Sequence, residues 1–450
     1  MAKEEREKST NSRFGKFIRL FFYITGSLTF LAIISLVASF FWDMYHPEHP
    51  QPLPVSEEKQ PSPGQVAEKI LNTLSNQPLH KTLLLAYEAY YQDKSQIVID
   101  SFDIISDKLK ETKLFPISVD NEERNLESTG KNSVQFTADG TLAVYLLSRR
   151  TKLSEAGGEF EGAYYVCPCY NTFYKIVKGK AEQFFETGHP VVFWVLQLDG
   201  SEVIFGEEKR TIEEKDKGKG DSSIVLKAVS LDGKKMRTIT EDFPQLGENS
   251  SFRISQDKNK LLGAWQEIQK NIILTVDLKS GKGERKEITE QTKRFSIDFL
   301  SLDGENLLLL QPQLVSDRVK LRLFNLKQGK VVVEREVWGL FTYSTNYPTE
   351  QLAMVAWDNS GKNIAINAWT TTKESGNAQI LIWQPETDTL GIAPEGVSSS
   401  YPIDWGQDRR LLLKSSENFY LYDPLETKVQ LVKLSNLYNK NSQILGIGWE

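Results

Sequence analysis

Few side chains in this sequence are of types that do chemistry. Its 450 residues include four histidines and two cysteines, and the cysteines stand one residue apart as Cys167-Pro168-Cys169. In an oxidising compartment this pair could close a very small disulfide ring. Redox motifs usually space their thiols C-x-x-C, so the alternative is two strand or turn thiols without a function. Because a metal site would need two further ligands, we predict no metal and no cofactor.

The histidines and acidic residues follow no catalytic pattern. The sequence contains no Gly-x-Ser-x-Gly nucleophile elbow, His-Glu-x-x-His zinc motif, Walker phosphate loop or EF-hand loop. His46 and His49 form a His-Pro-Glu-His tract, but no neighbouring ligands complete a metal site, and we interpret it as a spacer. The mixed-charge run from Glu207 to Asp221 is interpreted as a solvated hairpin tip. We therefore predict no catalytic residue.

The best candidate for a contact surface is aromatic. Residues 338–347 read WGLFTYSTNY and fall in a longer connection between repeated strands. Trp and Tyr are enriched at binding hot spots, so Trp338, Phe341, Tyr343 and Tyr347 are candidate binding residues if they are exposed. The alternative is that these rings fill the core, as aromatic side chains often do.

The elements that must position these residues are short β-strands. From Leu79 onward, segments rich in β-branched and aromatic residues alternate with Gly, Asn and Asp turns. Sets of such strands recur at intervals of roughly 40 to 50 residues, which is the period of four-stranded propeller blades. Seven copies cover residues 82–117, 141–187, 201–242, 260–290, 305–337, 362–395 and 410–435. We therefore predict an all-β, seven-bladed β-propeller over residues 79–450.

The two ends of the repeat array complement each other. A short strand introduces the later copies, as in Val355-Ala356-Trp357, but the first copy has a helix in that place. The chain ends with an isolated strand, Ile444 to Trp449, that has the same pattern. We predict that this C-terminal strand completes the first blade and closes the ring, which removes an open sheet edge.

The turns between the strands carry a family resemblance. The sequence Thr137-Ala138-Asp139-Gly140 follows a short strand, and degenerate forms occur at Gln256-Asp257, Asn359-Ser360-Gly361 and Gln407-Asp408. Residues 82–450 thus resemble the propeller of TolB-type and related WD-like repeat proteins, whose blades carry a strand that ends in Ser-Pro-Asp-Gly. The resemblance implies a ring of such blades. We interpret the segment from Ser255 to Asn259 as a turn of this kind.

The N-terminal region has the features of a membrane anchor. Leu20 to Trp42 is an uncharged apolar run of 23 residues, long enough to span a bilayer as a helix. Six basic residues precede it, which places the N-terminus in the cytoplasm. No small-residue cleavage site follows, so we expect a retained signal-anchor and a single-pass protein. The predicted divisions are 1–19 basic tail, 20–42 transmembrane helix, 43–63 Pro-rich linker, 64–78 short amphipathic helix capped by Ser62, and 79–450 propeller.

The charge balance and the missing motifs limit the function. Residues 20–450 hold 48 basic and 57 acidic residues, a balance of -9 that argues against nucleic acid as a partner. We expect an extracytoplasmic propeller at the cell membrane that binds a protein or a cell-envelope ligand without catalysis. The alternative is a glycoside- or peptide-acting hydrolase or lyase that uses paired carboxylates in the central channel.

Overall fold

The structure is a computed structural model of the chain. Residues Gln60–Glu450 form one compact unit. The structure describes residues 64–450 apart from 78, 92–93, 118–121, 127–132, 153–164, 217, 269, 290–295, 313–317, 339–354, 373–374, 395–396, 398–400, 406–408, 416–417 and 440–441, and for some strand residues beside these gaps it describes the backbone alone. The predicted tail, transmembrane helix and linker lie outside the described residues. No helix within the described residues is long and apolar enough to cross a membrane.

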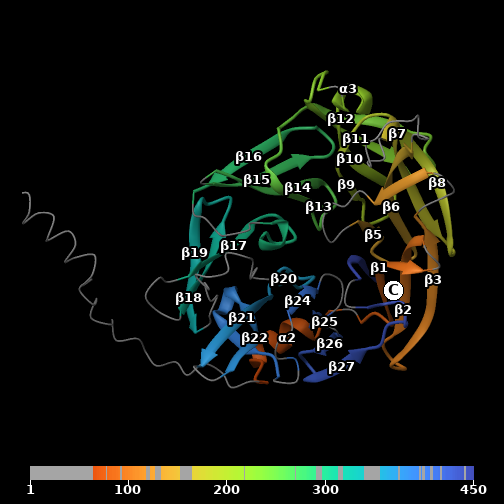
Figure 1. Cartoon of the computed structure of the whole chain (residues 1–450). Coiled ribbons are helices and arrows are strands. Elements are labelled where there is room, and N and C mark those ends of the chain that lie inside the picture. Colours follow the sequence, from red (N-terminus) through yellow and green to blue (C-terminus); the bar gives the residue numbers. More distant parts are fainter. Residues whose placement is uncertain are drawn as a thin grey trace, which may run out of the picture. The chain divides into compact units, whose positions relative to one another are not determined.

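Seven antiparallel sheets are arranged in a ring (Figure 1). Blade 1 contains β28 (Ile444–Trp449), β1 (Thr82–Tyr91), β2 (Lys94–Asp103) and β3 (Lys108–Pro116). Blade 2 contains β5 (Val134–Phe136), β6 (Leu142–Lys152), β7 (Tyr165–Val177) and β8 (Lys180–Thr187), with β4 (Glu122–Leu126) as an extra partner of β6. Blade 3 contains β9 (Val191–Leu196), β10 (Glu202–Glu208), β11 (Ile224–Ser230) and β12 (Met236–Phe243).

The remaining four blades repeat this order, from the inner strand to the outer one. Blade 4 contains β13 (Glu248–Ile254), β14 (Lys260–Glu267), β15 (Lys270–Asp277) and β16 (Gly283–Ile288). Blade 5 contains β17 (Asn306–Pro312), β18 (Arg318–Asn325) and β19 (Lys330–Trp338), with the 3-10 helix η1 (Ile297–Phe299) and one bridge, Leu300–Leu307, in the inner position. Blade 6 contains β20 (Val355–Trp357), β21 (Ile364–Thr372), β22 (Ser375–Gln384), the 3-10 helix η2 (Pro385–Thr387) and β23 (Thr389–Ile392). Blade 7 contains β24 (Tyr401–Asp404), β25 (Leu411–Lys414), β26 (Phe419–Asp423) and β27 (Lys428–Val432).

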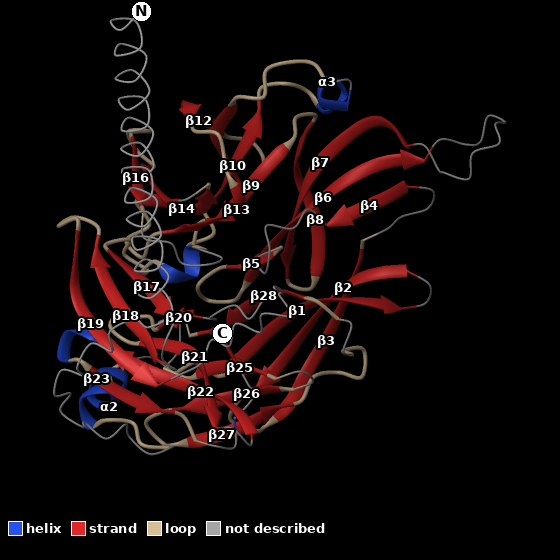
Figure 2. Ribbon diagram, turned by 60° about the vertical axis from the view of Figure 1, so that its left-hand side comes forward, coloured by secondary structure: helices blue, strands red, loops and turns tan. Residues whose placement is uncertain are grey.

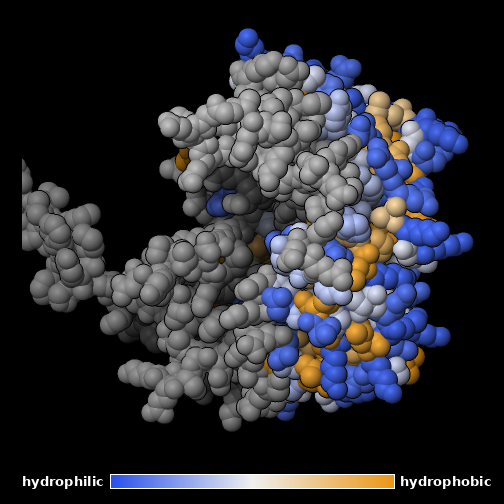
Figure 3. Space-filling model, turned by 45° about the vertical axis from the view of Figure 1, so that its right-hand side comes forward, coloured by the Kyte–Doolittle hydropathy of each residue, from blue (hydrophilic) through white to orange (hydrophobic). Residues whose placement is uncertain are grey.

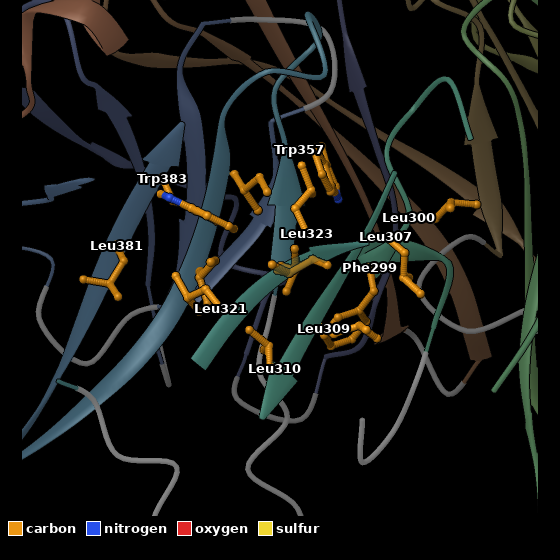
Figure 4. Close-up of a cluster of buried hydrophobic side chains, with 14 of the residues drawn as sticks. Phe299, Leu300, Leu307, Leu309, Leu310, Leu321, Leu323, Trp357, Leu381 and Trp383 are labelled. Atoms are coloured by element: carbon orange, nitrogen blue, oxygen red, sulfur yellow. The ribbon is translucent and has the colours of Figure 1, made fainter. Parts of the chain in front are cut away.

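The core lies between the blades rather than within any one of them. The middle strand β10 is buried along almost its whole length, whereas the outer strand β12 is mostly exposed. Buried apolar clusters join each pair of neighbouring blades around the ring, and the largest spans blades 4, 5 and 6. In it, Leu321 and Leu323 of blade 5 face Leu381 and Trp383 of blade 6 (Figure 4). The continuous apolar runs in the sequence therefore reflect strands covered on both faces.

The predicted ring closure is confirmed. β28 pairs antiparallel with β1, with Trp449 opposite Leu83 and Ile447 opposite Leu85. The backbone N–H groups of Lys81 and Thr82 also donate to the carbonyl oxygen of Glu450 at 2.9 Å. The last strand of the chain thus completes blade 1, and β1 is paired on both sides.

At five of the seven junctions, a polar side chain ties one blade to the next at a recurring position. A side chain of one blade donates to a backbone carbonyl oxygen in the turn between the third and fourth strands of the following blade. The pairs are Lys175 to Leu231 at 3.1 Å, Arg237 to Leu278 at 3.0 Å, Lys286 to Leu326 at 2.7 Å, Arg335 to Asp388, and Gln430 to Ile104 at 2.9 Å. These contacts satisfy turn carbonyls that would otherwise depend on water.

The predicted short helix is present but begins later than expected. α2 (Glu68–Leu74) has Ala67 as its N-cap and no side-chain cap, so the predicted cap at Ser62 is wrong. Ile70 and Leu74 are fully buried between blades 6 and 7. Upstream of the helix, the backbone of Gly64 and Gln65 pairs with Ile392 of β23, which holds the chain in an extended form where a helix start was expected. The only other α-helix among the described residues is α3 (Ile212–Asp216) (Figure 2).

Candidate binding face

The alternation of strands places the connections on two opposite faces of the ring. The turn face carries the turns between the first and second strands and between the third and fourth strands of each blade. Hydrogen bonds join these two sets, as from the Leu278 N–H to the Asn259 carbonyl at 2.9 Å. The loop face carries the hairpins between the second and third strands and the connections between blades. The Ile212 N–H, in one such hairpin, donates to the carbonyl of Gly188 in one such connection at 2.9 Å.

The two faces differ in the length of their connections. On the turn face the described turns are short, as in Asp139-Gly140 and Asp303-Gly304, with left-handed glycines at φ 69° and 77°. On the loop face, β6 and β7 are separated by residues 153–164, and β19 and β20 by residues 339–354. Long connections on a rigid scaffold are where binding residues concentrate in proteins.

The predicted aromatic residues begin on the loop face. Trp338 is the last residue of β19 and lies opposite Arg318 of β18, at the loop-face end of blade 5. Its side chain and the residues Phe341, Tyr343 and Tyr347 lie outside the described residues. Their role in binding therefore stays a prediction. Six other tryptophans are buried: Trp194, Trp265, Trp357, Trp383, Trp405 and Trp449.

Large apolar and aromatic side chains are exposed on the same face. Ile268, in the hairpin between β14 and β15, is 91 % exposed, and Tyr90, at the end of β1, is 72 % exposed. Tyr91 beside it is also exposed. Sequence reasoning missed these residues, because a hydrophobic residue at the end of a strand has the same local pattern whether it is covered or not. Exposed tyrosines and aliphatic side chains at hairpin tips can supply contact area to a partner.

A charged network fixes the loop-face end of blade 3. Glu207 and Glu208 end β10 and are 3 % and 6 % exposed, so the predicted solvated tip is wrong for these two residues. Glu207 pairs with Lys227 and accepts a hydrogen bond from Thr187 Oγ1 at 3.1 Å. Glu208 pairs with Arg210.

The same network holds α3 in place. Lys215 of α3 lies 3.1 Å from the Glu208 carboxylate, which joins the helix to the end of β10. Both buried carboxylates therefore have cationic partners. The two paired carboxylates thus hold the loop and α3 against the end of β10.

The two cysteines lie at an irregularity in blade 2. In the register of β6 and β7, Arg149 is opposite Tyr170 and Thr151 is opposite Val166, so Cys167, Pro168 and Cys169 together oppose a single residue of β6. This is a β-bulge, where a proline without an N–H is tolerated. The cysteine side chains lie outside the described residues, and the disulfide remains a prediction.

Charged side chains on the inner elements of blades 4, 5 and 7 form hydrogen bonds within the protein. Asp298 of η1 and Asp404 of β24 belong to blades 5 and 7, and Asp404 accepts a hydrogen bond from Trp449 Nε1 at 2.6 Å. Arg253 of β13 donates to the carbonyl oxygens of Leu300 and Ser301, the latter at 2.5 Å. Burial lowers the pKa of Arg253 to about 10, so it remains a cation at neutral pH.

No metal site is evident in these residues. The described ranges contain no group of three or more His, Cys, Asp or Glu side chains placed to hold a metal ion. His46 and His49 lie outside those ranges. His189 is held by the backbone, since its Nδ1 lies 3.2 Å from the Glu208 carbonyl oxygen and 3.1 Å from that of Arg210.

The repeated turns of the turn face have a common geometry. Thr137 donates to Asp139, Ser255 to Asp257 and Ser301 to Asp303 through their hydroxyl groups, at 2.5 to 2.6 Å. The hydroxyl of Thr137 holds the pKa of Asp139 below its usual range, and that of Ser255 does the same for Asp257. The predicted turn at Ser255 is confirmed. The sequence comparison overlooked the copy at Asp303-Gly304, and another at Asp199-Gly200.

Parts of this chain are similar to solved structures. TolB from Acinetobacter baumannii is similar over 71 % of this chain and 66 % of its own, with 12 % identity and a TM-score of 0.36. An oligogalacturonate lyase in complex with manganese is similar over 66 % of this chain and 75 % of its own, with 12 % identity and a TM-score of 0.39. A prolyl endopeptidase is similar over 81 % of this chain and 51 % of its own, with 9 % identity and a TM-score of 0.44. No family model and no curated protein matches the sequence.

The chain is therefore a seven-bladed β-propeller, defined by its seven sheets and its closing strand. The chain spans about two thirds of the TolB structure and about half of the prolyl endopeptidase. At these identities the similarity concerns the fold alone.

Proposed function

We propose that the chain is a membrane-anchored, extracytoplasmic β-propeller that binds a protein or a cell-envelope ligand on its loop face, without catalytic chemistry. The observation that carries this proposal is the concentration of long connections on the loop face, where exposed apolar and aromatic side chains are also present. Ile268 of blade 4 and Tyr90 and Tyr91 of blade 1 are exposed on this face, and the aromatic segment starts on the same face at Trp338 of blade 5. The predicted contact residues Phe341, Tyr343 and Tyr347 continue the chain from the same end of blade 5.

The anchor in this proposal rests on the sequence. The apolar run Leu20 to Trp42 follows a basic tail, and the Pro-rich segment 43–63 would act as an extended spacer. With the N-terminus in the cytoplasm, residues 43–450 face the outside. A cell-envelope or membrane-protein ligand is then the partner within reach.

Binding is favoured over hydrolysis by the arrangement of the inner strands. A glycosidase pair would need two carboxylates within about 10 Å of each other across a substrate. Asp404 on the inner strand of blade 7 already accepts a hydrogen bond from Trp449 Nε1. The buried Glu207 and Glu208 are each paired with cations.

The test compares two matched surface variants of the full chain in capture from solubilised membranes. One variant replaces three loop-face side chains, Tyr90→Ser, Tyr91→Ser and Ile268→Ser, and we expect it to lose the captured ligand. The control replaces Ile105→Ser and Met236→Ser on the turn face, where Ile105 is 75 % and Met236 56 % exposed, and we expect it to retain the ligand. Equal capture by both variants would contradict the proposed face.

A substrate screen addresses the catalytic alternative. The full chain is incubated with glycosidic and peptide substrates, and any activity is measured again in Asp298→Asn and Asp404→Asn variants. Turnover that one of these single changes abolishes, in a variant that unfolds like the parent, would overturn the non-catalytic proposal.

A further inference from the structure

The exposed charges of this chain are distributed unevenly among the turns between the third and fourth strands of the blades. Six exposed lysines occupy the turns between the third and fourth strands of blades 2, 3 and 4: Lys178, Lys180, Lys234, Lys235, Lys279 and Lys282. None of them forms an ion pair or a side-chain hydrogen bond with a described residue. The corresponding turn of blade 5 adds the exposed Lys327 and Lys330, whereas those of blades 6 and 7 carry the exposed acids Glu386, Asp388 and Glu426 with one exposed lysine, Lys428. We call the six lysines the basic arc.

The acidic residues within these turns are already engaged. Asp232 accepts a hydrogen bond from Ser230 Oγ at 2.6 Å, and Asp277 accepts one from Ser280 Oγ at 2.7 Å. The serine hydroxyls hold the pKa of both carboxyls below the usual range, so both are ionised at neutral pH. The arc thus has six positive charges against two negative ones, all at the outer rim of the turn face.

Exposed apolar side chains accompany the arc. Met236 follows Lys235 directly and is 56 % exposed, and Ile105 lies in the equivalent turn of blade 1 and is 75 % exposed. On the side of the molecule that carries β3 and β8, hydrophobic residues lie among hydrophilic ones (Figure 3). Lysines with interspersed apolar side chains are the composition that binds at the interface of an anionic membrane.

We propose that the basic arc docks on the anionic phospholipid surface of the membrane, so that the propeller rests on the bilayer by the rim of blades 2 to 4. The arc lies on the tips of three successive turns, a convex arrangement that meets a broad charged surface, whereas a polyanionic chain would need a groove. The proposal rests on the proposed membrane anchor, which would keep the propeller within reach of that surface. The loop face, opposite the arc's face, would remain open to its partner.

Lysine acylation of the full chain tests this docking. The protein is reconstituted in nanodiscs of phosphatidylcholine alone or with one third phosphatidylglycerol, and is labelled briefly with an acetyl ester and read by mass spectrometry. We expect arc lysines to be labelled at least threefold more slowly in anionic discs, and this protection to disappear in 0.5 M salt. The exposed loop-face lysines Lys209 and Lys219 should be labelled equally in both discs.

Two charge-reversal variants provide the matched comparison. Lys234→Glu with Lys235→Glu should abolish the protection of Lys279 and Lys282, whereas Lys209→Glu with Lys219→Glu should leave it intact. Equal labelling of the arc in both discs, or protection that survives salt, would overturn the proposal. Soluble polyglutamate is also added to the protein in neutral discs. If it protects the arc lysines as strongly as anionic discs do, the arc binds acidic polymers, and the membrane proposal is overturned.

Flotation with vesicles separates this inference from the anchor. If the anchor is wrong, the chain will not float with neutral vesicles, and the arc still predicts flotation with anionic ones. If only the arc is wrong, the chain will float equally with both and its lysines will show no lipid-dependent protection.

Discussion

A steric requirement between blades can be tested with one glycine and its matched control. Gly281 and Gly329 occupy equivalent turns of blades 4 and 5, with φ angles of 71° and 65°. A Cβ at Gly281 would meet the backbone oxygen of Ile239 in the outer strand of blade 3, far inside van der Waals contact, whereas at Gly329 nothing lies within 4 Å. Gly281→Ala and Gly329→Ala therefore both force an alanine into a left-handed backbone conformation. Only Gly281→Ala also brings the new Cβ into steric overlap with the Ile239 oxygen.

The backbone cost is common to both variants, so the difference in unfolding free energy follows from the clash and from one weakened hydrogen bond. The left-handed conformation costs an alanine about 1–2 kcal/mol at either position. Relieving the clash at Gly281 requires the turn or β12 to move, and overpacking of this kind costs about 1–3 kcal/mol. The same movement weakens the hydrogen bond from Arg237 to the Leu278 carbonyl, and a bond to a charged group contributes about 1.5–3 kcal/mol. We expect Gly281→Ala to be less stable than Gly329→Ala by about 2–4 kcal/mol.

Urea unfolding of the fragment 60–450, followed by tryptophan fluorescence, measures this difference. With a slope of about 3 kcal/mol per molar, the midpoint of Gly281→Ala should lie about 1 M below that of Gly329→Ala. Gly233, in the equivalent turn of blade 3, would meet the backbone oxygen of Phe184 and should behave like Gly281. Indistinguishable midpoints for Gly281→Ala and Gly329→Ala would refute the close packing of these turns on the preceding blade.

Three further results are expected for the same fragment. A variant that ends at Asn441 lacks β28, including the buried Trp449, and its unfolding free energy should fall by more than about 5 kcal/mol. If this variant unfolded at the same temperature as the parent, the ring closure would be excluded. Arg409→Leu leaves the buried carboxylate of Asp423 without its cation and should lower the unfolding free energy, measured in urea, by about 3–5 kcal/mol. The double variant Arg409→Leu/Asp423→Leu should recover much of this loss, and no recovery would contradict the expectation. The Ser255 hydroxyl lowers the pKa of Asp257, so this carboxylate stabilises the fold above the unfolded-state pKa of about 3.9 and loses that effect as pH falls through its lower folded-state pKa. Stability should therefore fall less between pH 6 and 3 in Asp257→Asn than in the parent, and parallel profiles would count against it.

The repeat pattern of the sequence was sufficient to predict the fold. Each predicted copy contains the second to fourth strands of one blade, because a strand covered on both faces reads as a short apolar run bounded by turn residues. The closing strand could be predicted since Ile444 to Trp449 repeats the pattern of Val355 to Trp357. The helix start was wrong because the segment around Gly64 and Gln65 pairs with β23, a contact between residues far apart in the sequence.

The candidate surfaces were less accessible to sequence reasoning. The burial of Glu207 and Glu208 depends on Lys227 and Arg210, which reach them from a neighbouring strand and the following loop. Their charges looked solvated because local composition does not show which cation packs on which carboxylate. The basic arc was also hidden, since a net charge sums over both faces and only the ring places the turns of successive blades side by side.

The central claim is that the loop face holds the partner, and site-specific crosslinking in membranes tests it most directly. A photoreactive amino acid is placed at Ile268 on the loop face or, as the control, at Val332 on the outer strand β19, where the side chain is 40 % exposed. Both variants should unfold at the same urea concentration as the parent. We predict a discrete crosslinked product at Ile268 that is absent at Val332. A product at Val332 with none at Ile268 would contradict the assignment of the binding face.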